Sequence, residues 1–221
     1  MDKKLALDTE ILMSTFGLKR NHGCLILDEL LKTNVKADDP TMQAMEVHRL
    51  RLIEEGDFWN EEELKMQFLA FLFFHIGINE ANKIKIFYER ALKTKVEGKT
   101  ISVICDCMLA KPFGVNRPDT PYFFLQEAPS QPSPKGKERK RNDDAEGQML
   151  GAMLIAKTMN GNKKPVYGAF LQGRNWVFAT LHGKDYCVSE QFDASKVEGF
   201  GQIIGILRNL KKIILTELLK F

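Results

Sequence analysis

The sequence predicts an α/β protein in which helices flank a central mixed β-sheet, because helical and strand-like segments are interleaved along the chain. Their order is helices, three strands, a helix, two or three strands and a final helix, which argues against a helix bundle and a β-sandwich. Apolar residues make up 44% and charged residues 28% of the 221 residues, enough for a sizeable core. This length suits a single α/β unit.

The N-terminal quarter is predicted to be helical. Apolar side chains recur at helical spacing over residues 5–55, with an interruption at residues 36–40. Gly56 and Asp57 then break the pattern. We therefore divide the chain into an N-terminal helical extension over residues 1–56 and an α/β domain over residues 57–221, and expect one compact unit.

The α/β domain should begin with an apolar helix near Trp59, for which Asn60 or Asp57 is the N-cap. The strands that follow are expected over residues 85–96, 100–110 and 122–127, and the first two form a hairpin around Glu97-Gly98-Lys99. The remaining expected elements are a helix from Asp143 or Asp144 to about Met159, strands over 166–171, 176–181 and 186–188, and a last helix from about Lys196.

The sequence has no apolar run near the roughly 20 residues that a membrane helix needs, and no signal-peptide core. We therefore expect a cytoplasmic protein without a membrane partner. No cysteines have zinc-binding spacing, and Cys24 and Cys187 stand alone. Cys105 and Cys107 flank Asp106, so a regular strand would point both thiols to the face opposite this aspartate. All four cysteines are interpreted as small buried apolar side chains.

Two acidic residues stand out because they belong to apolar strands. Asp106 lies in a run that is apolar on both faces, and Glu127 ends the next predicted strand. A buried carboxylate costs several kcal/mol unless a cation or hydrogen-bond donors compensate it. Two such carboxylates on neighbouring strands could bind Mg²⁺ or Mn²⁺ and activate a water for phosphodiester hydrolysis. The alternative is that each carboxylate pairs with a Lys or Arg in a structural role.

Several segments together resemble a family of bacterial PD-(D/E)xK-type proteins, which are related to the nuclease domains of restriction enzymes. The resemblance covers roughly residues 57–221 and depends on the order and spacing of the segments. They are WNEEELK (59–65), ICDCMLA (104–110), PYFFLQE (121–127), AEGQMLGAM (145–153), VYG (166–168) with GRNWVF (173–178), and SEQFDA (189–194). The resemblance implies a restriction-endonuclease-like core and a metal-dependent nuclease that acts on DNA.

Carried over by position, the resemblance assigns Asp106 and Glu127 as metal ligands. Glu61 and Glu63 occupy the region where some members place a further carboxylate, and Glu63 is the further metal ligand that we select. Gln148 matches a helix glutamine that is often found near the site, so we count it as a third catalytic residue. The cofactor implied is Mg²⁺, or Mn²⁺.

The sequence departs from the family pattern at the motif lysine, because Pro129 stands two residues after Glu127. Proline has neither a charge nor a hydrogen-bond donor. The loss of a cation that faces a reacting phosphate costs several kcal/mol of transition-state stabilisation. Either another lysine replaces it in space, with Lys135, Lys137 or Lys157 as candidates, or the site is inactive.

A basic cluster lies in the proline-containing stretch that follows Glu127. As a nucleic-acid-binding loop it would contact phosphates; the alternative is a solvated loop. Its members are Lys135, Lys137, Arg139, Lys140 and Arg141. Three hypotheses remain: a Mg²⁺-dependent DNA nuclease, a non-catalytic relative that binds nucleic acid or a protein, and a structural protein whose carboxylates are ion-paired. The N-terminal helices would be an accessory cap or would form a homodimer.

Overall fold

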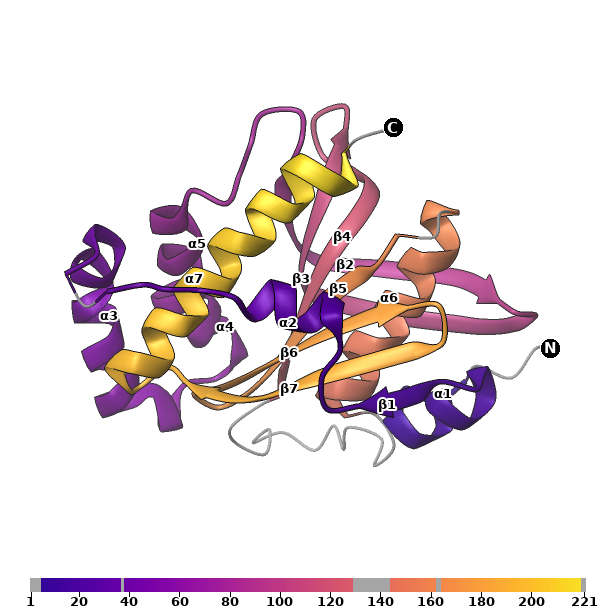
Figure 1. Ribbon diagram of the computed structural model, residues 1–221, viewed down its shortest axis with the longest axis horizontal. Coiled ribbons are helices and arrows are strands. Elements are labelled where there is room, and N and C mark those ends of the chain that lie inside the picture. Colours follow the sequence, from indigo (N-terminus) through magenta and orange to yellow (C-terminus); the bar gives the residue numbers. More distant parts are fainter. Residues whose placement is uncertain (1–4, 37, 129–143, 162–163, 220–221) are drawn as a thin grey trace.

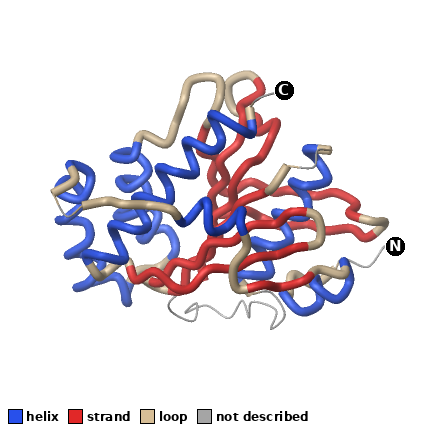
Figure 2. Tube along the Cα trace, in the orientation of Figure 1, coloured by secondary structure: helices blue, strands red, loops and turns tan. Residues whose placement is uncertain are grey.

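The computed structural model describes residues 5–36, 38–128, 144–161 and 164–219, except for the side chains of residues 127 and 128. Its centre is a seven-stranded mixed sheet with the strand order β1-β7-β6-β5-β4-β3-β2 (Figure 2). The strands are β1 (Lys19–Asn21), β2 (Lys85–Val96), β3 (Lys99–Phe113), β4 (Arg117–Ala128), β5 (Val166–Gln172), β6 (Asn175–His182) and β7 (Asp185–Asp193). The expected α/β class, with a mixed sheet between helices, is confirmed.

Six of the seven strands form two antiparallel three-stranded units, which meet at the parallel pair of β4 and β5. Strands β2, β3 and β4 follow one another as antiparallel neighbours, and so do β5, β6 and β7. Helix α6 (Ala145–Asn160) connects the two units, so that β4 and β5 run parallel. Asp144 caps the start of α6, and Gly161 ends it in the left-handed conformation, as the sequence predicts.

Helices cover both faces of the sheet (Figure 1). Helices α1 (Thr9–Phe16) and α6 cover one face, where they form the α6-side core around Leu12, Phe124 and Met149. The other face carries the α7-side core, which includes Phe68, Trp176 and Phe200. The helices on that side are α2 (Leu25–Leu31), α3 (Pro40–Glu55), η1 (Gly56–Phe58), α4 (Glu61–Leu64), η2 (Lys65–Leu69), α5 (Ala70–Ile76), α7 (Val197–Ile213) and η3 (Ile214–Leu218).

The N-terminal segment packs against the rest of the chain. We predicted that it is helical throughout, but it also contains a strand. Residues 19–21 form β1, which pairs in parallel with β7 at the edge of the sheet. This strand is short, polar and fully exposed, so it carries no alternating hydrophobic pattern that could have revealed it. Among the described residues, no helix combines the length and the apolar character needed to cross a membrane.

Cys24 and Cys187 form a disulfide, which corrects the prediction that both are lone apolar thiols. The two residues are separated by 163 positions in the sequence, so their spacing gave no signal of pairing. Cys24 precedes α2 and Cys187 lies in β7, so the bond ties the N-terminal segment to the sheet. Cysteine usage therefore no longer supports a reducing compartment.

Candidate metal centre

The first wall of the candidate site is a continuous helix over residues 61–76, made of α4, η2 and α5. Asn60 begins it with a capping box: its Oδ1 accepts from the Glu63 amide at 3.0 Å, and Oε2 of Glu63 accepts from the Asn60 amide at 2.7 Å. One wide π-helical turn follows at Lys65–Leu69, a feature often found at functional sites. This turn begins at the buried Lys65.

The second wall is an irregular point in the β2–β3 hairpin. Glu89 of β2 has a φ of 50°, which is uncommon for a residue other than glycine. The regular pairs lie on either side of it, at Tyr88↔Cys107 and Arg90↔Cys105. Regular pairing of β2 with β3 is therefore interrupted at Glu89 and Asp106.

The irregularity reverses which face the side chains of β3 occupy. Cys105 belongs to the α6-side core and Cys107 to the α7-side core, so the expectation that both share one face is wrong. The two-residue alternation on which that expectation relied is therefore broken at Asp106, where β3 faces the irregular Glu89 of β2. Asp106 lies at the reversal and is 4% exposed.

Three carboxylates meet at this point. One oxygen from each of Glu61, Glu89 and Asp106 lies within 4.8 Å of the other two. Asp106 is buried, Glu61 is half-buried and Glu89 is exposed, so the cluster lies at the protein surface with its deepest ligand in the sheet. Burial, together with the negative charges of Asp106 and Glu89, raises the pKa of the adjacent Cys105 thiol, so this cysteine is not an activated nucleophile.

Lys65 is the cation of this cluster. Its Nζ lies 3.2 Å from Oε1 of Glu61 and donates to Oε1 of Glu89, and its side chain is only 6% exposed. Three carboxylates thus lie close to one ammonium, and a divalent cation would add positive charge beside them.

Gln126 and Gln148 connect the cluster to the opposite face of the sheet. Nε2 of Gln126 donates to Oδ2 of Asp106 at 2.5 Å and to Oε1 of Gln148 at 3.0 Å. Gln126 is 1% exposed in β4, and Gln148 lies in the first turn of α6. Gln148 therefore acts on Asp106 through Gln126. Among the described residues, no direct hydrogen bond joins Gln148 to the Asp106 carboxylate.

The other predicted site residues have different places. Glu63 forms the capping box and is not one of the three clustered carboxylates, so the predicted choice of Glu63 over Glu61 does not fit the geometry. Glu127 lies in β4 beside Leu171 of β5, with its side chain outside the described part. Lys157 donates to the Gly183 carbonyl, and burial lowers its pKa. Pro129 and the basic cluster of Lys135, Lys137, Arg139, Lys140 and Arg141 lie outside the described residues.

The clustered residues fit a hard divalent cation. All three offer carboxylate oxygens, which Mg²⁺ and Mn²⁺ prefer. Two oxygens on opposite sides of one Mg²⁺ stand about 4.2 Å apart, since each bond is about 2.1 Å long. The observed upper separation of 4.8 Å is close to that span, so small side-chain rotations would suffice.

Sequence reasoning missed Glu89, Lys65 and Gln126. Glu89 lies in a strand of alternating charge, and only its backbone conformation distinguishes it. Lys65 follows Glu61 by four residues, a common pattern on exposed helices, so its burial was not evident. Gln126 offered a signal that could have been used, because it is a polar residue within the apolar run of β4.

Neither a scan against protein-family models nor a search of curated proteins finds a match for this chain.

Proposed function

We propose that this protein is a Mg²⁺- or Mn²⁺-dependent phosphodiesterase that cleaves DNA, with Glu61, Glu89 and Asp106 as the residues that would hold the cation. The proposal rests on one observation: carboxylates from a helix and from both strands of the β2–β3 hairpin meet beside a buried lysine. Its relation to PD-(D/E)xK nucleases is part of the proposal. The pairing of β3 with β4 supports it, because Asp106 and Glu127 then belong to neighbouring strands.

A divalent cation in such a site supplies Lewis-acid polarisation of the phosphate and a lowered pKa of its bound water. The protein's own groups would position that chemistry. Gln126 holds Oδ2 of Asp106, and Gln148 in turn fixes the amide of Gln126. The orientation of Asp106 is thus set before any ligand arrives, which is the condition for effective electrostatic stabilisation.

We assign to Lys65 the role of the motif lysine, whose position in this sequence is occupied by Pro129. Its ammonium contacts two of the three clustered carboxylates, so a phosphate oxygen near the cation would lie close to this positive charge. It reaches the cluster from the helix at 61–76. The lysine that we expected to substitute from α6, Lys157, is held at Gly183 instead.

The same contacts favour a second function, a non-catalytic protein that binds nucleic acid. Lys65 already pairs with Glu61 and Glu89, so its ammonium can compensate these carboxylates without a metal. In that case Asp106 and its amide network would be structural. The two functions differ in one measurable property, the affinity of the wild-type protein for Mg²⁺ and Mn²⁺.

The test is isothermal titration of Mg²⁺ and Mn²⁺ into the wild type, Asp106→Asn and Glu54→Gln. Glu54 is the control because it is an exposed glutamate of α3 that lies outside the cluster. We expect saturable binding in the wild type and the control, and none in Asp106→Asn. Wild-type protein that binds neither ion contradicts the phosphodiesterase and supports the non-catalytic function.

Cleavage is then measured on linear duplex, nicked and single-stranded DNA with Mn²⁺. The phosphodiesterase should lose at least 100-fold in rate in Asp106→Asn, because removal of one metal ligand removes most of the electrostatic stabilisation. Equal residual cleavage in wild type and Asp106→Asn would identify a contaminating nuclease.

A further inference from the structure

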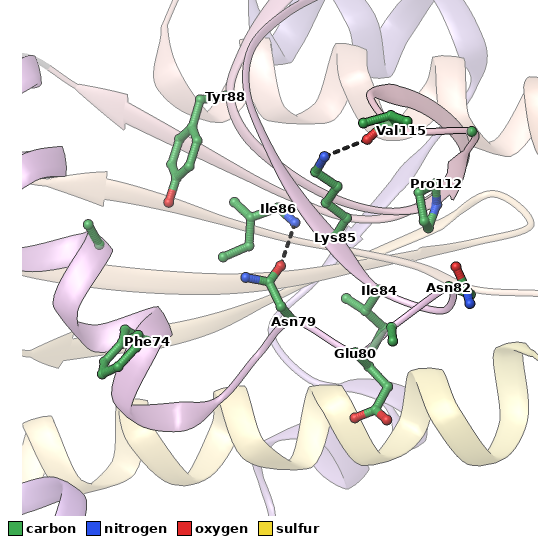
Figure 3. Close-up of a pocket in the computed structure, with 13 residues that line it drawn as sticks. Phe74, Asn79, Glu80, Asn82, Ile84, Lys85, Ile86, Tyr88, Pro112 and Val115 are labelled. Carbon is green, nitrogen blue, oxygen red and sulfur yellow. Dashed lines mark hydrogen bonds between the residues drawn. The ribbon is translucent and has the colours of Figure 1, made fainter.

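Next to the candidate metal centre lies a groove at the outer edge of the sheet (Figure 3). It runs between the end of α5, the connection over residues 77–84, strand β2 and the turn between β3 and β4. Its volume is about 570 Å³, within the range of ligand-binding clefts. Side chains that line it include Phe74, Asn82, Lys85, Tyr88, Pro112 and Val115.

The walls of the groove expose large apolar side chains. Phe74 is 75% exposed, Tyr88 is 39% exposed and Val115 is 88% exposed. In Figure 3, Phe74 of α5 and Tyr88 of β2 lie toward one end of the groove, and Pro112 and Val115 lie toward the other. Exposed apolar groups gathered around a cleft mark a binding surface more often than singly scattered ones do.

Two lysines lie at the groove. Lys85 lines it and donates to the Val115 carbonyl at 2.6 Å, and Lys83, which stands between the lining residues Asn82 and Ile84, is exposed. Glu80, the acidic residue of the lining, is paired with Lys211 at 3.3 Å.

The groove and the clustered carboxylates are built on the same two elements. In β2, Tyr88 of the lining directly precedes Glu89 of the cluster. The helix at 61–76 carries Lys65 beside the cluster and Phe74 in the lining.

We propose that this groove binds single-stranded nucleic acid, which it directs toward the carboxylates; this inference rests on the proposed phosphodiesterase function. Lys83 and Lys85 complement the phosphates, and the rings of Phe74 and Tyr88 offer faces on which unpaired bases stack. In a duplex the bases already stack on one another and cannot use these rings. The combination of exposed rings and cations thus favours a single strand over a duplex.

The test is the fluorescence anisotropy of a labelled ten-nucleotide deoxythymidine strand, measured with EDTA so that neither metal binding nor cleavage contributes. Tyr88→Ala and Phe74→Ala should each weaken binding about ten-fold, and Tyr88→Phe should retain it. Phe58→Ala is the matched control, because Phe58 is 77% exposed but does not line the groove. Circular dichroism and thermal melts establish that each variant is folded.

The cations are tested by the salt dependence of the same binding. Lys85→Gln should lower the slope of log affinity against log salt by about 0.7. Lys196→Gln is its control, because Lys196 is 76% exposed at the start of α7 and lies outside the groove lining. Equal slopes for both variants would count against phosphate contact by Lys85.

The inference is overturned if the strand fails to bind, or if Tyr88→Ala and Phe74→Ala bind it as the wild type does. It is also overturned if a duplex of the same length binds more tightly and depends on the same two residues. Binding that needs Tyr88 and Phe74 in a protein without metal affinity or cleavage would support the groove while rejecting the phosphodiesterase. The two proposals can therefore fail separately.

Discussion

Gln126 donates its Nε2 to Oδ2 of Asp106 at 2.5 Å, and both side chains are almost fully buried in the middle of the sheet. The bond joins β3 to β4, and through Gln148 it continues to α6. An amide in this position supplies a donor to a carboxylate that would otherwise be costly to bury.

Gln126→Leu should lower the free energy of unfolding by about 1–3 kcal/mol, because Asp106 would lose a buried donor. Urea unfolding at neutral pH measures the change. Gln172→Leu is the control, since Gln172 ends the neighbouring strand β5 but is exposed, and it should change stability by less than about 0.5 kcal/mol. Similar values for the two variants would show that the amide of Gln126 does not compensate Asp106.

Lys65→Met should lower the stability of the metal-free protein by about 2 kcal/mol. Its removal leaves Glu61, Glu89 and Asp106 without this ammonium, and the partial exposure of Glu61 and Glu89 reduces the cost below that of a fully buried pair. The same variant should bind Mn²⁺ more tightly than the wild type but cleave DNA more slowly. Thermal shift with and without Mn²⁺, combined with the cleavage assay, measures both effects; parallel losses of affinity and rate would contradict the assigned role.

Asp39→Asn should destabilise the protein by about 1 kcal/mol at neutral pH, and the difference should shrink as the pH falls below the ordinary pKa of Asp. The carboxylate of Asp39 accepts two hydrogen bonds from Arg208, and these lower its pKa. A lowered pKa stabilises the fold above the ordinary pKa of Asp, and this contribution is lost as the pH falls through the folded-state value. Asparagine keeps the capping oxygen for the Thr41 amide, but it loses the charge and one of the two acceptors for Arg208.

These pH-dependent stabilities are measured by urea unfolding at several pH values between 3 and 7. Asp57→Asn is a useful comparison, because Asp57 also pairs with an arginine but is 67% exposed. Its effect should be smaller at every pH. A loss in Asp39→Asn that persists unchanged at pH 3 would contradict the role of the Asp39 charge.

The Cys24–Cys187 disulfide should stabilise the protein by about 2–4 kcal/mol under oxidising conditions, because it closes a long loop of the unfolded chain. Cys24→Ser should therefore unfold at lower urea than the oxidised wild type. After treatment with a reductant the two proteins should unfold at similar urea concentrations. Peptide mapping without reduction checks the bond directly, and the recovery of both thiols free in the oxidised protein would contradict it.

Most of the fold could be predicted from the sequence because its elements carry strong local sequence patterns. Alternating and apolar runs marked β2, β3, β5 and β6, and the caps Asn60, Asp144 and Gly161 marked helix ends. Elements without such signals were missed or shortened. β1 is polar, and β4 begins at Arg117 within a stretch that two prolines made resemble a loop.

By itself the sequence determined the secondary structure of the main elements, the mixed sheet between helices, and the choice of Asp106 as a candidate site residue. Those features depend on periodicity, capping and the cost of a carboxylate in an apolar strand, which are local properties. Only the tertiary structure decided which groups accompany Asp106. Glu61 and Lys65 come from the helix at 61–76, Glu89 from β2 and Gln126 from β4, and Glu89 has a positive φ. A local sequence pattern does not encode which elements meet in space, nor the backbone conformation of a single residue. The position of the Lys65 ammonium beside these carboxylates is therefore known only from the tertiary structure.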